Sequence, residues 1–119
     1  MNVEELREYC LSKSGATECA PFGDNTIVFK VGPEEHGRAF ALMPLDKRYV
    51  MVKCNPQRAI ALRERYPEIE AAYHMNKVHW NGVFLEGSLS DSFIRELIDH
   101  SFDMVLQGFP KRIRDNFML

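Results

Sequence analysis

The chain has 119 residues, a length that fits one domain with a single hydrophobic core. Its composition is that of a globular protein, with 45% hydrophobic and 27% charged residues, and no apolar run approaches the roughly 20 residues that a membrane helix needs. The net charge of -2 argues against strong nonspecific binding to nucleic acid, for which a basic domain is usual.

The N-terminal half of the chain predicts one helix and three strands. Asn2 and Glu5 have the spacing of a capping box, so we expect a helix over residues 3–13. Runs of β-branched, aromatic and apolar residues predict strands over residues 26–31, 38–43 and 49–53, separated by turn-forming segments. An antiparallel three-stranded meander is the economical arrangement.

The C-terminal half predicts two more helices, a strand and a short tail. Asn55 and Pro56 have the pattern of a helix start, and Pro67 ends that helix. Residues 80–85 form the next predicted strand. Ser90 begins the longest helix, which Gly108 and Pro110 stop. Its inward face is marked by Ile94, Leu97, Ile98, Ser101 and Val105. The tail, residues 111–119, predicts a basic helical turn that docks through Ile113 and Phe117. Together these elements predict an α+β domain in which helices pack on an antiparallel sheet.

Cysteine content and the N-terminus bear on location. Cys10, Cys19 and Cys54 are an odd set without C-x-x-C spacing, so we expect reduced, buried thiols. The first residues are acidic and lack the apolar segment of a secretory signal. We therefore expect a cytoplasmic protein with no membrane partner. For the oligomeric state, we favour a monomer.

Residues 73–81, Tyr-His-Met-Asn-Lys-Val-His-Trp-Asn, are the densest group of functional side chains. They hold two of the four histidines and the only tryptophan, which marks a site or a tightly constrained turn. The spacing of His74 and His79 does not match a helical zinc pair, and no second ligand pair exists in the sequence, so we expect no metal and no cofactor. Alternatively, the block is a core-facing clamp with Trp80 inside, which pins the last strand to the helices.

Catalytic and acidic candidates are weaker. Cys54 is the better nucleophile candidate because it precedes a helix N-terminus, where thiol pKa values fall, but a single cysteine at a strand end is far more often packing. We expect no enzymatic activity. Glu4, Glu5 and Glu8 share one helix and could meet a cation or a basic partner, or form an ordinary solvated face.

Basic residues are concentrated after residue 35. Residues 1–35 carry seven acidic and three basic side chains, and the remainder carries ten acidic and twelve basic ones. Several of the later lysines and arginines alternate with tyrosines and Trp80. Cations neutralise phosphates and aromatic groups touch bases, so this mixture suits nucleic acid, although it equally suits ordinary surface charge.

Five motifs in order along nearly the whole chain resemble the MmcQ/YjbR family of small bacterial proteins. They are Pro21-Phe22-Gly23, Phe29-Lys30-Val31, Lys53-Cys54-Asn55-Pro56, the Tyr73–Lys77 block with His79-Trp80-Asn81, and Ile98-Asp99-His100-Ser101-Phe102 with Val105. The Tyr73–Asn81 block is the most specific. Two departures are Ala71-Ala72, where members often have Pro-Gly, and Gly82, where threonine is common.

The resemblance implies a CyaY-like fold and a likeness to "double wing" DNA-binding proteins, an implication that rests on fold analogy. It leads to the hypothesis of a non-enzymatic DNA-binding protein with a regulatory role and one contiguous binding surface. The expected surface residues are Lys47, Arg48, Lys53, Arg58, His74, Asn76, Lys77, His79 and Trp80. The alternative, from similarity to frataxin in fold, is a metal or protein interaction module that uses the acidic first helix.

Overall fold

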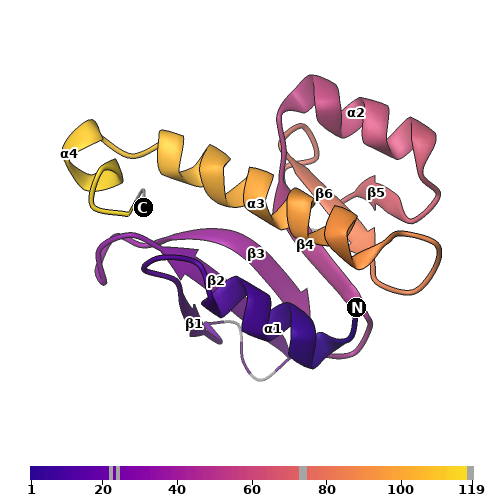
Figure 1. Ribbon diagram of the computed structural model, residues 1–119, viewed down its shortest axis with the longest axis horizontal. Helices are drawn as coiled ribbons and strands as arrows, with labels where there is room; N and C mark the ends of the chain where they lie inside the picture. The colour runs from indigo at the N-terminus through magenta and orange to yellow at the C-terminus, as the bar shows by residue number, and fades with distance from the viewer. Residues whose placement is uncertain (22, 24, 73–74, 118–119) are drawn as a thin grey trace.

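One six-stranded, fully antiparallel sheet organises the computed structural model, which describes residues 1–21, 23, 25–72 and 75–117. The strands are β1 (Thr17–Cys19), β2 (Thr26–Val31), β3 (Arg38–Pro44), β4 (Tyr49–Lys53), β5 (Ile69–Ala71) and β6 (Trp80–Phe84). Their order across the sheet is β1-β2-β3-β4-β6-β5. The chain therefore leaves β4, runs through a helix to the far edge at β5, and returns to insert β6 beside β4 (Figure 1).

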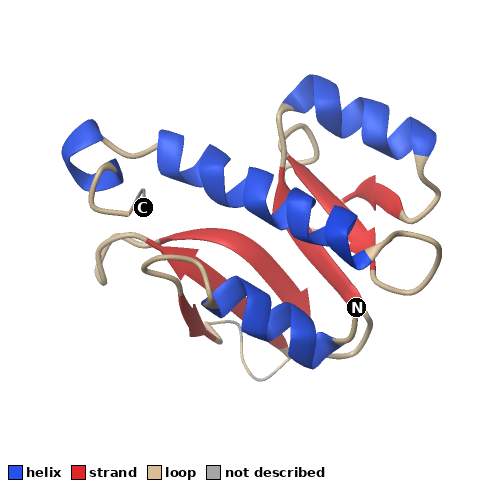
Figure 2. Ribbon diagram, in the orientation of Figure 1, coloured by secondary structure: helices blue, strands red, loops and turns tan. Residues whose placement is uncertain are grey.

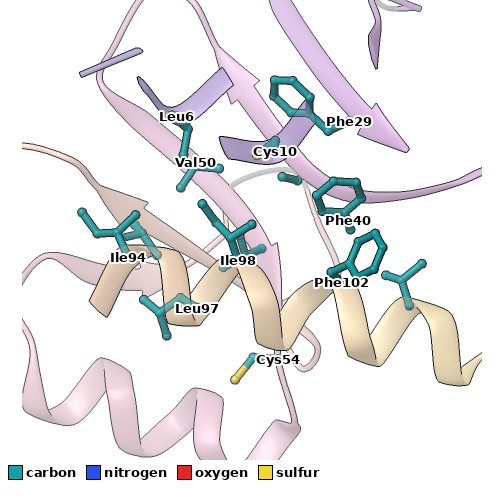
Figure 3. Packing of buried hydrophobic residues seen from close by; sticks show 14 of the residues in the cluster. Leu6, Cys10, Phe29, Phe40, Val50, Cys54, Ile94, Leu97, Ile98 and Phe102 are labelled. Atoms are coloured by element: carbon teal, nitrogen blue, oxygen red, sulfur yellow. The ribbon is translucent and has the colours of Figure 1, made fainter. Parts of the chain in front are cut away.

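The helices pack on one face of this sheet. They are α1 (Val3–Leu11), α2 (Pro56–Arg65), α3 (Asp91–Gln107) and the short α4 (Lys111–Arg114). Figure 2 shows α1 and α3 crossing the same side of the sheet. Side chains from α1, α3 and alternate strand positions form the main core, and the edge-to-face contact of Phe40 with Phe102 joins β3 to α3 (Figure 3).

Most of the predicted elements are confirmed. The capping box of Asn2 and Glu5 is present, the cap of Asn55 starts α2, and Ser90 caps α3. The five residues predicted to mark the inward face of α3 are all buried. In the tail, Ile113 and Phe117 pack against the main core. The first helix ends at Leu11, two residues earlier than expected.

Two strands were not predicted. β1 and β5 each contain three residues and lie at the two edges of the sheet, so the meander of β2, β3 and β4 is only the middle of a larger sheet. Edge strands this short have too few residues to show an alternating pattern in the sequence. They form because they pair with the neighbouring strand of the sheet. Among the described helices, none is long and apolar enough to cross a membrane.

The second face of the sheet carries a smaller apolar cluster without any residue from the described helices. Val28, Leu42, Tyr49 and Met51 are buried there, with Ala72 from the segment after β5. Tyr49 lies over Gly82, and its ring and hydroxyl occupy the space that a Cβ atom would need. This packing explains why residue 82 is a glycine here, although threonine is common at this position in the family that the sequence resembles.

Candidate functional site

The junction between β4 and α2 is held by three hydrogen bonds to consecutive backbone amides. The amide of Lys53 donates to Ser101 Oγ at 2.8 Å, that of Cys54 to the carbonyl of His79 at 2.7 Å, and that of Asn55 to His100 Nε2 at 3.2 Å. The acceptors come from α3 and from the turn before β6. Residues that the sequence groups into separate motifs therefore meet at one place.

Ser101 is the most enclosed of these partners, with no exposed surface. Its hydroxyl accepts from Lys53 and donates to the carbonyl of Phe40 at 2.6 Å, so it bridges β3 and β4. A buried backbone group without a hydrogen-bond partner destabilises the folded state, and the Ser101 hydroxyl gives a partner to two such groups. The backbone that carries Lys53 is thereby fixed from the helix side of the sheet.

The turn before β6 is closed by Asn76. Its Oδ1 accepts from the amide of Val78 at 2.9 Å, and its carbonyl accepts from the amides of His79 and Trp80. Arg63 of α2 donates through Nη1 to the carbonyl of Lys77 at 2.9 Å. The turn is thus tied to both β6 and α2, while the side chains of Asn76 and Lys77 remain exposed.

Lys53 and Trp80 are direct cross-strand partners on the second sheet face. The register pairs their Cα atoms, and Val52 and Asn81 beside them face the helices. Because strand side chains alternate, Lys53 and Trp80 point away from the helices. Trp80 is half-buried against the smaller apolar cluster, and its indole N–H has no hydrogen-bond partner among the described residues. Within that same part of the chain, Lys53 and Lys77 form no ion pair.

Asn81, and not Trp80, is the buried anchor of β6. Asn81 is 1% exposed, and its Nδ2 donates to the carbonyl of Ala59 in α2 at 3.2 Å. The clamp interpretation placed Trp80 inside the core against the helices, whereas Trp80 is half-buried and lies on the face away from them. Residues 75–81 therefore divide between a structural part at Asn81 and a part at Trp80 that reaches the second face.

The structure brings together five of the nine residues expected to form one surface: Lys53, Asn76, Lys77, His79 and Trp80. Lys47 and Arg48 precede β4 and lie at its opposite end, beyond Tyr49, which is itself four residues or about 14 Å along the strand from Lys53. Lys47 Nζ lies over the ring of Tyr49, and Arg48 pairs with Glu86 at 3.2 Å. These two side chains are thus separated from the other five.

Arg58 and His74 complete the set of nine. Arg58 belongs to α2 and pairs with Glu96 of α3 at 2.6 Å, so it joins two helices on the first face. His74 lies outside the described residues.

Lys30 of β2 is an addition to the expected surface. Phe29 and Val31 beside it belong to the main core, so Lys30 points to the second face. It pairs with Ala39 near the same end of the sheet as Lys53, and two strand spacings, about 10 Å, separate β2 from β4. The alternation of β2 shows which face Lys30 occupies, but only the strand order shows that Lys53 shares it.

The catalytic and metal candidates acquire no support from the geometry. Cys54 is 3% exposed, and burial raises the pKa of its thiol more than Arg58 and Arg63 lower it, so the thiol has the buried, packing environment expected of a cysteine at a strand end. Cys10 and Cys54 are buried and Cys19 is half-buried. Among the described residues, no three His, Cys, Asp or Glu side chains gather as metal ligands, and Glu5 of the acidic helix is used in its cap.

Comparisons with known proteins identify the relatives of this chain. The family model described as YjbR matches residues 11–104. YjbR of Escherichia coli strain K12 is 32% identical over 114 residues, covering 96% of this chain and 95% of that protein. YbdF of Escherichia coli O157:H7 is 35% identical over 96 residues, covering 79% of this chain and 75% of that protein.

A solved structure agrees with these matches. The crystal structure of Deinococcus radiodurans protein DR2400, which contains a DUF419 domain, superposes with a TM-score of 0.91 and 34% sequence identity, covering 98% of this chain and 87% of that one. The match of the family model, the identity to YjbR over nearly the whole length and the shared fold lead to one conclusion. The chain belongs to the YjbR family.

Proposed function

We propose that this protein binds DNA, without catalysing a reaction, through the second face of its sheet at the end where Lys53, Lys77 and Trp80 lie. The observation that carries the proposal is the pairing of Lys53 with Trp80 on a face to which the described helices contribute no side chain. A cation beside an aromatic ring offers one group for a phosphate and one for a base.

The availability of the charges supports this proposal. Several cations elsewhere are engaged with carboxylates, including Arg7 with Glu18, Arg48 with Glu86 and Arg58 with Glu96. Lys30, Lys53 and Lys77 have no such carboxylate partner in the part of the chain that the structure describes. Binding a phosphate to them would therefore break no ion pair among the described residues.

A rigid mounting supports the proposal further. Ser101 holds the backbone of Lys53, and Asn76 and Arg63 hold the turn that carries Lys77. Groups held in place lose less conformational entropy when they bind a ligand. The absence of a catalytic step is part of the proposal, because the buried Cys54 thiol has a raised pKa and a nucleophile needs the opposite.

Fluorescence anisotropy with labelled DNA of mixed sequence, titrated at several salt concentrations, tests the proposal. We expect affinity to fall steeply as salt rises, because bound lysines release counterions from the phosphates. Lys53→Ala and Lys77→Ala should each weaken binding and reduce the slope of log affinity against log salt by about one unit.

Lys47→Ala is the matched control, since it removes the same charge from an exposed position at the other end of β4. It should leave the salt slope near that of the unchanged protein. Absence of binding at low salt would contradict the proposal, and so would equal losses in all three variants.

A further inference from the structure

The shape of the proposed surface indicates which form of nucleic acid it fits. A protein that reads a duplex through the major groove inserts an α-helix or a two-stranded ribbon into it. Here α1, α2 and α3 pack their buried faces on the first face of the sheet, opposite Lys53 and Trp80 (Figure 2). Within the described residues, no helix is therefore placed to enter a groove from the proposed surface.

The hairpin of β2 and β3 is the ribbon nearest to this surface. Its turn lies at the same end of the sheet as Lys53 and Trp80, since Val31 pairs with Arg38 there. Glu34 and Glu35 are both exposed in that turn. Two carboxylates at the tip would meet the phosphates that line a groove, and like charges repel. The hairpin is thus poorly suited to enter duplex DNA.

Trp80 instead has the properties of a stacking platform. Its side chain packs, half-buried, against the smaller apolar cluster on this face, which holds it in place while part of it remains exposed. Lys53 lies directly across the strand pair, where Cβ atoms are roughly 5 Å apart. Lys77 lies exposed in the turn that leads into β6. An aromatic ring beside a cation on a sheet is the arrangement by which proteins bind unpaired bases and their backbone.

We infer that the surface binds an unpaired nucleic-acid strand, with one base stacked on Trp80 and the backbone phosphates beside Lys53 and Lys77. Stacking accepts every base because each has a π-face, so binding is independent of sequence. This inference rests on the proposed function and narrows its ligand to the single-stranded form.

Trp80 also supplies the measurement, because it is the only tryptophan in the chain. Its intrinsic fluorescence is followed while a 20-nucleotide oligothymidine, or a duplex of the same length and mixed sequence, is added at one low salt concentration. We expect the oligothymidine to quench the emission through stacking, and to bind at least roughly tenfold more tightly than the duplex.

Variants separate stacking from charge. Trp80→Leu should lose roughly 5- to 150-fold in affinity for oligothymidine, the equivalent of about 1–3 kcal/mol, while Trp80→Phe should keep most of the affinity because a ring remains. Anisotropy of labelled oligothymidine follows these two variants, and circular dichroism checks that both are folded. Lys77→Ala should weaken binding but keep the same quenching at saturation.

The outcomes distinguish this inference from the proposed function. If the protein binds neither oligonucleotide, both the proposed DNA binding and the single-strand inference are wrong. Binding of duplex at least as tight as that of oligothymidine would overturn the single-strand inference and leave DNA binding standing. Tight binding of oligothymidine with unchanged fluorescence, and with Trp80→Leu as tight as the unchanged protein, would overturn the stacking role.

Discussion

At the scale of single residues, the side-chain hydroxyl of Ser101 takes the place of a backbone-to-backbone hydrogen bond between β3 and β4. The ladder pairs Ala41 with Val52 and Leu42 with Met51, and beyond it the hydroxyl of Ser101 joins Phe40 to Lys53. The sequence correctly predicts that Ser101 faces inward. It could not predict the bridge, because Phe40 is 61 residues away in the chain.

Ser101→Ala should therefore destabilise the protein. The variant leaves the carbonyl of Phe40 and the amide of Lys53 without this partner in a buried place, which costs roughly 1–3 kcal/mol. Urea unfolding followed by circular dichroism measures the loss. Ser92→Ala, at an exposed position of the same helix, should change the free energy of unfolding by no more than about 0.5 kcal/mol. Equal midpoints for the two variants would refute the bridge.

At the scale of elements, α3 organises the start of α2. His100 of α3 accepts through Nε2 from the amide of Asn55, and Asn55 in turn caps α2 by accepting from Gln57 and Arg58. Burial lowers the pKa of His100, and the positive charge of Arg58 lowers it further. His100 must be neutral to accept this bond, so the junction depends on its protonation.

This junction predicts a pH dependence with a definite sign. The pKa of His100 is lower in the folded protein than in the unfolded chain, so the unfolded chain binds the proton first as the pH falls. The contribution of His100 to stability is present above the ordinary histidine pKa of 6.5, and is lost as the pH falls through the lower value of the folded state.

Thermal melting or urea unfolding between about pH 7.5 and pH 5 checks this dependence, because the window spans the ordinary histidine pKa. His100→Gln, which cannot titrate, should show a shallower loss of stability than the unchanged protein. His36→Gln, at an exposed turn position, is the control and should keep the unchanged protein's slope. An identical slope in all three proteins would exclude the role of His100.

At the scale of the whole molecule, an acidic protein carries a surface with free lysines. The net charge is -2, and several surface arginines are paired with carboxylates, so binding depends on how the remaining charges are placed. Glu70 of β5 pairs with Gly82 and therefore lies on the second face, diagonal to Trp80 and exposed. It is the nearest carboxylate on the strands that carry the proposed surface.

Glu70→Gln should strengthen binding of the oligothymidine. Removing a negative charge near the phosphates reduces repulsion, and we expect a gain of roughly threefold at low salt that shrinks as salt rises. Anisotropy measures both. Glu64→Gln on α2 removes the same charge from an exposed helix position and is the control. If both variants gain equally, only net charge matters and the proposed surface has no local role.

The sequence alone determined the helices and the central meander, because periodicity, caps and turn residues are local signals. The resemblance of its motifs indicated the family. Within the candidate site it correctly grouped Lys53 with Trp80 and the turn at Asn76 and Lys77. It also joined them to Lys47, Arg48 and Arg58, which the tertiary structure places elsewhere.

Only the tertiary structure decided which residues share a face. The insertion of β6 between β4 and β5 brings Trp80 beside Lys53, and the strand order adds Lys30 to the same face. It also turns Asn81 toward α2 and leaves Trp80 on the opposite side. These arrangements depend on pairing between strands far apart in the chain, and shifting a register by one residue would exchange the two faces, so no local pattern could specify them.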